Sequence, residues 1–341
     1  MAPRTGSCSR SRSRSRSRRQ TAAPAGPLRL GFVGVGAIGS GTIEGLLRSL
    51  PGGGPPSDLP EGELAITVRD SRPEGRVTVA QTDQAVVDAA GVVFVGTGNF
   101  GPHALAPAAA VALLGGLRFR RGQLVVSCCQ RLTRDQVAAA VAAGGLLPAA
   151  SGDGEPDGGG VVKAMSNPSP RAGDATTVLH PPHPLAAMLY GRVGAVIGLE
   201  READFAPCYA ATALMGSLFA QLRAAAGWLE AQGVAPEAAA RYAAATHACY
   251  AREALRGCTG GVTEVEVTER GTAALAQLVA GQTAGGLNQQ VLAEMGRAGA
   301  YEQIPRSLDG ILARIVGRRG GGPSPGGAGG SGAAGGAPAP S

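Results

Sequence analysis

Residues 28–50, LRLGFVGVGAIGSGTIEGLLRSL, place an apolar run, a glycine motif and a helical pattern directly after one another. Residues 30–35 carry the apolar side chains of a buried strand, and the apolar spacing over 43–50 predicts a helix. Between them lies a Gly-x-Gly-x-x-Gly motif at 34–39. A strand, a glycine turn and a helix in this order predict a dinucleotide-binding unit. The alternative is a glycine-rich surface turn, because 55 of the 341 residues are glycine.

Each glycine of the motif has a predicted role. Gly34 permits a tight turn, the missing Cβ of Gly36 lets the backbone approach a pyrophosphate, and Gly39 lets the helix pack closely on the strand. The unpaired N–H groups at the start of the helix then meet the phosphates. The predicted cofactor-binding residues of this turn are Gly34, Gly36, Ala37, Ile38 and Gly39.

The end of the second predicted strand bears on the choice of cofactor. That strand covers 64–68, follows a loop insertion and ends at Arg69-Asp70-Ser71-Arg72. In a dinucleotide-binding fold this position meets the adenosine ribose, where an acid binds the 2′-hydroxyl of NAD and arginines pair with the 2′-phosphate of NADP. Arg69 and Arg72 favour NADP, while Asp70 keeps NAD possible. A solvated charged turn is the alternative for both arginines.

Strand and helix patterns alternate up to about residue 200, which predicts a doubly wound α/β domain. Strands are predicted at 77–80, 92–95, 123–128 and 161–165, and helices at 83–90, 103–114 and 133–143.

Beyond residue 200 the composition becomes rich in alanine and the pattern becomes helical. One long pattern covers 206–232, stops at Gly233 and restarts after Pro236. Small residues with few large apolar side chains suit a tightly packed bundle. The predicted fold class is α/β, with an N-terminal Rossmann-like doubly wound domain followed by an all-α dimerisation domain. The predicted segments are an Arg/Ser-rich N-terminus (1–27), the dinucleotide-binding domain (28–200), the helical dimerisation and substrate domain (201–316) and a Gly/Ala/Pro tail (317–341).

The charge of the chain is concentrated at its N-terminus. Residues 1–20 carry seven arginines and no acid, so the formal charge of +6 falls to about −1 for the remainder. A nearly neutral folded part argues against a general nucleic-acid-binding surface. No apolar run is long and uninterrupted enough to predict a membrane span. We therefore expect neither nucleic-acid nor membrane partners.

The Arg/Ser-rich N-terminus resembles an organelle transit peptide, and it lacks the apolar core of a secretory signal. This interpretation predicts a plastid or a mitochondrion, and without it we expect a cytoplasmic protein. The alternatives are an Arg-Ser repeat that contacts RNA and a tail without a function. The C-terminal tail, almost entirely Gly, Ala, Pro and Ser, indicates disorder.

The six cysteines and four histidines show no CxxC pair and no ligand spacing, so no metal site is predicted. Near the C-terminus, residues 283–290, TAGGLNQQ, place a Gly-Gly loop before a helical region. Successive N–H groups at Gly285 and Gly286 could form a nest for a substrate carboxylate. An ordinary helix break is the alternative.

Several blocks between residues 28 and 316 resemble pyrroline-5-carboxylate reductases in order and spacing. GFVGVG at 31–36 is similar to the first-strand signature of that family, and VVKAMSNPSPRAGDATTVL at 161–179 is similar to its Arg-x-Met-Pro-Asn-Thr-Pro block. TALMGS at 212–217 resembles Ala-Leu-Ser-Gly-Ser, and TAGGLN at 283–288 resembles Ser-Pro-Gly-Gly-Thr-Thr.

The resemblance implies an NAD(P)H-dependent oxidoreductase that reduces the C=N bond of pyrroline-5-carboxylate to give proline, a step of proline biosynthesis. It also implies a homodimer or higher homo-oligomer built on the helical domain. The nicotinamide would deliver hydride to the imine carbon. The substrate carboxylate would rest on Gly285 and Gly286, Asn288 would lie near the ring nitrogen as the catalytic residue, and Asn167 would line the nicotinamide side.

The chain departs from the family at positions of the implied substrate pocket. Met215 stands where the family has Ser, Leu218-Phe219 where it has Gly-Pro, and Asn288 where it has the threonine that donates toward the imine nitrogen. An Asn amide donates a hydrogen bond but does not readily release a proton. Three hypotheses stand: a pyrroline-5-carboxylate reductase, a reductase of another imine or 2-oxo acid, and a non-catalytic dinucleotide-binding protein on the same scaffold.

Overall fold

The computed structural model describes residues 28–49, 65–68, 77–98, 104–145, 159–167, 170–263 and 265–317. Three sequence predictions fall outside these ranges. They concern the Arg/Ser-rich N-terminus, the pair Arg69 and Arg72, and the tail from residue 318 onward.

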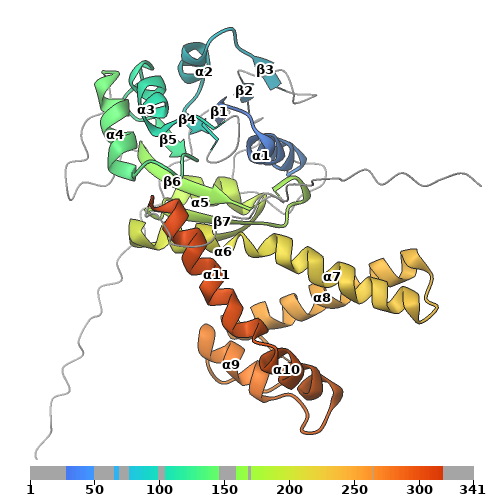
Figure 1. Cartoon of the computed structure of the whole chain (residues 1–341). Helices are drawn as coiled ribbons and strands as arrows, with labels where there is room; N and C mark the ends of the chain where they lie inside the picture. Colours follow the sequence, from blue (N-terminus) through green and yellow to red (C-terminus); the bar gives the residue numbers. More distant parts are fainter. Residues whose placement is uncertain are drawn as a thin grey trace, which may run out of the picture.

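Within the described residues, one eight-stranded sheet has the strand order β3-β2-β1-β4-β5-β6-β7-β8 (Figure 1). Neighbouring strands pair in parallel, except that β6 and β7 are antiparallel. The strands are β1 (Arg29–Val33), β2 (Ala65–Val68), β3 (Val77–Val79), β4 (Val92–Val95), β5 (Leu124–Ser127), β6 (Gly160–Ser166), β7 (Ala175–His180) and β8 (Gly194–Gly198).

Helices cover both faces of this sheet. They are α1 (Ala37–Arg48), α2 (Asp83–Ala89), α3 (Pro107–Gly115), α4 (Arg134–Ala143) and α5 (Pro184–Gly191), with a 3-10 helix η1 (Pro170–Ala172). The core residues of α1 and α5 share one apolar cluster with the sheet, and those of α2, α3 and α4 share another. Strand β4 shows the division, because Val92 and Phe94 belong to the first cluster while Val93 and Val95 belong to the second.

The prediction of an α/β doubly wound domain is confirmed, and the local signals explain several of its boundaries. Thr133 caps α4 through the predicted capping box, in which its hydroxyl accepts from the Gln136 amide and Gln136 bonds back to the cap. The antiparallel turn from β6 into β7 has no counterpart in the sequence pattern. The reason is that an apolar run predicts a strand but not whether that strand pairs in parallel or antiparallel with its neighbour.

The described chain after Gly198 is helical. A 3-10 helix η2 (Glu202–Asp204) leads into α6 (Phe205–Ala211), α7 (Leu214–Ala231), α8 (Pro236–Thr259), α9 (Thr272–Ala280), α10 (Leu287–Arg297) and α11 (Ala300–Ile315). The predicted stop falls between α7 and α8, where Gly233 adopts a φ of +91° that favours glycine. Helices α7 and α8 lie side by side as one arm, while α9 and α10 lie at the far end of the helical part from the sheet (Figure 1).

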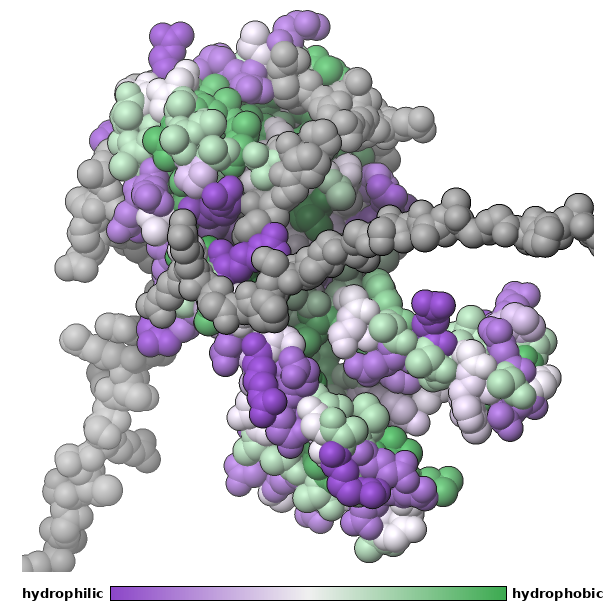
Figure 2. All heavy atoms as spheres, in the orientation of Figure 1, coloured by the Kyte–Doolittle hydropathy of each residue, from purple (hydrophilic) through white to green (hydrophobic). Residues whose placement is uncertain are grey.

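A single copy does not form the tightly packed bundle that the composition predicts. Of the described apolar residues after Gly198, those that are buried are Phe205, Ala210, Ala226, Ala239, Ala243 and Ala274. Large side chains face outward instead, including Trp228 at 64% and Phe219 at 58% exposure. Figure 2 shows apolar and polar residues mixed over these arms. Alanine therefore fills the contacts within one chain, and the larger apolar groups remain uncovered.

One described stretch, Glu202–Ala231, is long and apolar enough to cross a membrane by length and composition alone. This corrects the expectation that no such run exists. The reason lies at Thr212 and Ala213, which keep helical backbone angles and so join α6 to α7 into a longer stretch.

Candidate functional site

From β1 the chain builds the sheet in one direction through β2 and β3, and then returns to place β4 on the other side of β1. In a doubly wound fold this switch point forms a crevice at the carboxyl ends of β1 and β4. Gly34 ends β1 with a φ of +82°, a backbone conformation that glycine adopts without strain. A Cβ on Gly34 would overlap the carbonyl oxygen of Gly96, which follows β4. The Gly96 amide in turn donates to the Val33 carbonyl at 2.8 Å. The prediction of a tight turn at Gly34 is confirmed, and the turn closes against the next strand.

The N-terminus of α1 is open where a phosphate would approach. Gly36 is its N-cap residue, and a Cβ built there would meet nothing within 4 Å. Within the described residues no side chain caps this helix, and its first turn contains no acid. The first N–H groups and the helix dipole therefore favour an anion here. Gly36 leaves space for that anion, which is the role that the sequence predicts for it.

The role predicted for Gly39 belongs to other glycines. A Cβ on Gly39 would make only ordinary contacts, the nearest at 3.5 Å from the Gly34 oxygen. A Cβ on Gly41 would lie 3.1 Å from Pro170, and one on Gly45 would overlap the Pro170 carbonyl oxygen. The close packing of α1 is thus made with η1 and not with the strand, at Gly41 and Gly45, which follow Gly39 in the same helix. The motif spacing could not reveal this, because η1 lies far away in the sequence.

Asn167 lies at the carboxyl end of β6 and is attached to β7. Its side-chain oxygen accepts from the Thr176 backbone N–H at 3.0 Å, and its backbone N–H donates to the Thr176 carbonyl at 3.1 Å. Asn167 precedes η1 by three residues, so its backbone leads directly to the segment that packs on α1. The predicted position beside a nicotinamide remains a prediction.

The Gly-Gly loop precedes α10, and Gly286 is the N-cap of that helix. The Gly285 amide donates to the Gln289 side chain at 2.7 Å, and the Gly286 amide donates to the Thr283 carbonyl at 2.9 Å. Asn288 donates from its side chain to Gln282 at 2.9 Å and is exposed. A carboxylate that bound these amides would have to displace acceptors that the chain itself supplies.

The two parts of the predicted site are not brought together within one chain. The glycine turn follows β1 at the carboxyl edge of the sheet, whereas α10 lies at the end of the helical part that is farthest from the sheet (Figure 1). Gly34, Gly36 and Asn167 therefore share one end of the molecule, and Gly285, Gly286 and Asn288 lie at another.

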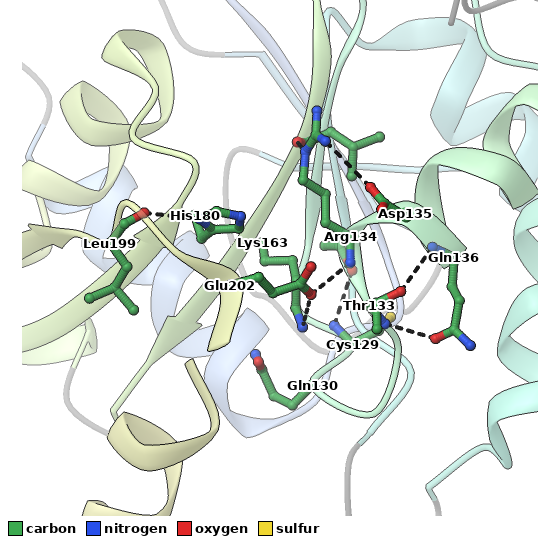
Figure 3. A network of polar contacts seen from close by, with 12 residues as sticks. Cys129, Gln130, Thr133, Arg134, Asp135, Gln136, Lys163, His180, Leu199 and Glu202 are labelled. Atoms are coloured by element: carbon green, nitrogen blue, oxygen red, sulfur yellow. Dashed lines mark hydrogen bonds and ion pairs between the residues drawn. The ribbon is translucent and has the colours of Figure 1, made fainter. Parts of the chain in front are cut away.

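A buried polar network lies where the sheet meets the helical part, and sequence reasoning missed it (Figure 3). Lys163 of β6 pairs with Glu202 of η2, with 3.0 Å between Nζ and Oε1. The same Glu202 oxygen accepts from the Arg134 amide, at the start of α4, at 2.7 Å. One signal was available in the sequence, because Lys163 is the single lysine among 31 basic residues.

Two further polar features lie near the sheet. Burial raises the pKa of Cys128 to about 12, and it also raises the pKa of Tyr190, whose hydroxyl lies 3.7 Å from the Cys128 sulfur. His183 caps α5 by accepting from the Ala186 amide, and burial lowers its pKa. Neither feature was predicted. Within the described ranges no cluster of three His, Cys, Asp or Glu side chains could hold a metal.

A shallow cavity of about 250 Å³ lies between the end of α6 and the end of α11. It begins at the predicted TALMGS block, because Thr212 and Ala213 line it together with Tyr209 and α11. Tyr209 also packs against the cluster of Met165, Val178 and Phe205. The cavity is therefore one side chain away from the end of β6.

No family model matches the chain, and no curated protein matches it by sequence. Among solved structures, the pyrroline carboxylate reductase of Plasmodium falciparum with NADP bound has a TM-score of 0.60 and 11% identity, over 85% of this chain and 98% of that one. The whole fold is similar to that of pyrroline-5-carboxylate reductases. The enzyme of Streptococcus pyogenes has a TM-score of 0.59 and 17% identity, over 85% and 99% of the chains. That of Coxiella burnetii has a TM-score of 0.59 and 18% identity, over 84% and 96%.

Proposed function

We propose that this chain is an NADP(H)-dependent oxidoreductase that reduces the C=N bond of a cyclic imine carboxylate, with pyrroline-5-carboxylate as the first substrate to test. The observation that carries the proposal is the open, uncapped turn at Gly34 and Gly36 on a chain whose full architecture is similar to pyrroline-5-carboxylate reductases. The fold similarity by itself would support many dehydrogenase activities.

The residues at the crevice fit a dinucleotide. Gly36 leaves space for the pyrophosphate, and the N–H groups of Ala37, Ile38 and Gly39 would donate to it. Arg69 and Arg72 would select the 2′-phosphate of NADP, with NAD as the second choice. NADP in the similar Plasmodium falciparum structure supports this preference.

The bound cofactor would supply a hydride to the imine carbon, and the chain would bind, orient and shield the reactants. When the imine nitrogen arrives protonated, hydride addition gives the neutral amine without a further acid. The side-chain oxygen of Asn288 would accept from the iminium N–H, and its amide would donate to the nitrogen lone pair that forms as the hydride adds, which would hold the ring in place. A carboxylate bound at Gly285 and Gly286 would fix the other side of the ring.

We further propose that the active unit is a homodimer formed through the helical part. Large apolar side chains such as Phe219 and Trp228 are exposed there, and a protein surface of this kind is normally covered by a partner. A second copy would also place an Asn288 loop near the glycine turn of its neighbour, which the single chain does not do (Figure 1).

A second candidate is the reduction of a different imine or a 2-oxo acid. The side chains that favour it are Met215 and Phe219, which are large and 44% and 58% exposed. A non-catalytic dinucleotide-binding protein is the third candidate, favoured by the loss of the threonine at position 288.

The deciding experiment is a turnover assay with purified full-length protein, NADPH and pyrroline-5-carboxylate, with proline measured as the product. Proline formation at the rate of NADPH oxidation supports the proposal. Tight NADPH binding without turnover on this substrate, or on a panel of cyclic imines and 2-oxo acids, would favour the non-catalytic protein instead. An absence of binding to both NADPH and NADH would exclude all three candidates.

A further inference from the structure

The chain contains 30 arginines and one lysine, Lys163. Its side chain is 5% exposed, although a charged lysine is normally found at the surface. Arginine serves at every other basic position of the sequence. The ammonium of Lys163 is a compact and strongly hydrated point charge, so its burial requires a counter-charge close to it.

The surroundings of Lys163 are specific (Figure 3). Its Nζ lies 3.0 Å from Glu202 Oε1 and 5.1 Å from the centroid of the Phe205 ring, so a carboxylate and an aromatic face both stabilise the charge. Glu202 Oε1 also accepts from the Arg134 amide, where the negative charge complements the N-terminus of α4. One carboxylate oxygen therefore joins three elements of the fold.

Each of these elements leads to a different part of the proposed site. The loop before α4 follows β5 at the carboxyl edge of the sheet, and Ser127 at the end of β5 pairs with Lys163 in the register of β6. Strand β6 continues from Lys163 to Ser166, and Asn167 follows it directly. Phe205 begins α6, which leads to the cavity at Thr212. The contacts of Glu202 are thus the junction between the cofactor edge and the helical part.

We propose that Lys163 and Glu202 are positioning residues that fix the helical part against the carboxyl edge of the sheet, and that the reaction proposed above depends on this fixed geometry. Neither residue is among those that we propose to hold the substrate or the cofactor. The pair acts through the loop before α4, through the end of β6 and through α6. The statement that catalysis depends on this pair rests on the proposed function. The effect of the pair on the geometry does not.

The informative substitution is Lys163→Met, because it removes the charge and keeps an unbranched apolar stem of similar length. Glu202 is 28% exposed in its side chain, so its carboxylate stays hydrated and can still accept from Arg134. Glu202→Gln would instead leave a buried ammonium without a counter-charge, and this variant is more exposed to misfolding. A matched control is Arg201→Gln, which removes the neighbouring ion pair between Arg201 and Asp204 at the surface.

Hydrogen–deuterium exchange tests the geometry without any need for turnover. In Lys163→Met, peptides covering 129–137 and 202–213 should exchange roughly tenfold faster, while a peptide covering α1 should not change. Selective ¹⁵N-lysine labelling gives a second readout, because the chain has one lysine and its ammonium should give one slowly exchanging signal. Glu202→Ala should broaden or abolish that signal, and Arg201→Gln should leave it in place.

Kinetics then tests the consequence for the reaction. Lys163→Met should lower kcat/KM roughly tenfold or more while the NADPH dissociation constant stays within about twofold, because the glycine turn lies on other strands. Unchanged exchange in both peptides would overturn the positioning role, and so would faster exchange with unchanged kcat/KM. If the unaltered protein shows no turnover, the proposed function fails, and the exchange and NMR results alone decide whether the pair holds the junction.

Discussion

A methyl group on Gly34 would overlap the carbonyl oxygen of Gly96, so the turns after β1 and β4 touch at a point that excludes any side chain. Gly36, two residues further along, faces open space instead. The two glycines therefore have different requirements, one from the fold and one from the ligand.

Gly36→Val should abolish the rise in melting temperature that NADPH causes, while the unliganded protein keeps its stability. Gly34→Ala should destabilise the protein by at least about 1–2 kcal/mol, the cost of a left-handed backbone for an L-residue, before the overlap is included. Thermal unfolding with and without NADPH measures both. Gly191→Ala, at a position where a Cβ also meets open space, serves as the control. Normal NADPH stabilisation in Gly36→Val would disprove the phosphate site.

Replacing Arg69 and Arg72 together by Ala should weaken NADPH binding far more than NADH binding. Only NADP carries the 2′-phosphate that the guanidinium groups would pair with. Titration calorimetry with each cofactor gives the comparison. Arg121→Ala, an exposed arginine just before β5 and so at the opposite edge of the sheet, is the control. Equal losses for the two cofactors would show that the arginines form a solvated turn.

Asn288→Thr should raise or preserve turnover of pyrroline-5-carboxylate, since a hydroxyl can also donate to the imine nitrogen. Asn288→Leu should raise the barrier by about 1–3 kcal/mol, the cost of leaving the substrate nitrogen in the closed site without its hydrogen-bond partner. Steady-state kinetics measures both changes, with Gln290→Leu on the same helix as the control. Turnover that appears only in Asn288→Thr would indicate a pocket adapted to another imine.

The protein should be a homodimer at micromolar concentration, as measured by light scattering. Phe219→Glu and Trp228→Glu should shift it toward monomer, because each places a charge on an exposed apolar face of α7. Val111→Glu is the matched control on the sheet domain, where Val111 is also partly exposed on α3. A stable folded monomer of the unaltered chain would contradict the dimer.

The helix cap at His183 predicts how stability depends on pH. Burial lowers the pKa of His183 below the unfolded value of 6.5, so the unfolded state binds the proton first. The free energy of unfolding should therefore fall as the pH decreases through 6.5 toward the lowered value. Urea unfolding of His183→Asn, which keeps a side-chain acceptor, should lack this dependence. If His183→Asn keeps the pH dependence of the unaltered protein, groups other than His183 cause that dependence.

The sheet domain was largely predictable from local sequence, because strands such as β4 and turns such as Gly34 carry their own signals. The partners of those elements were not. Nothing near Gly41 or Gly45 indicates that both pack on Pro170, and nothing near Lys163 indicates Glu202. The sequence names both halves of the predicted site, but sequence order carries no information on which copy of a chain supplies a loop.

The contact of Gly41 and Gly45 with Pro170 has a mechanical consequence. Glycine at these two positions lets η1 lie directly on the backbone of α1, so that no side chain separates the two segments. The first turn of α1 is where an anion would bind, and Asn167 precedes Pro170 by three residues. A displacement of α1 caused by a ligand would therefore act directly on η1, with no side chain between the two segments to absorb it.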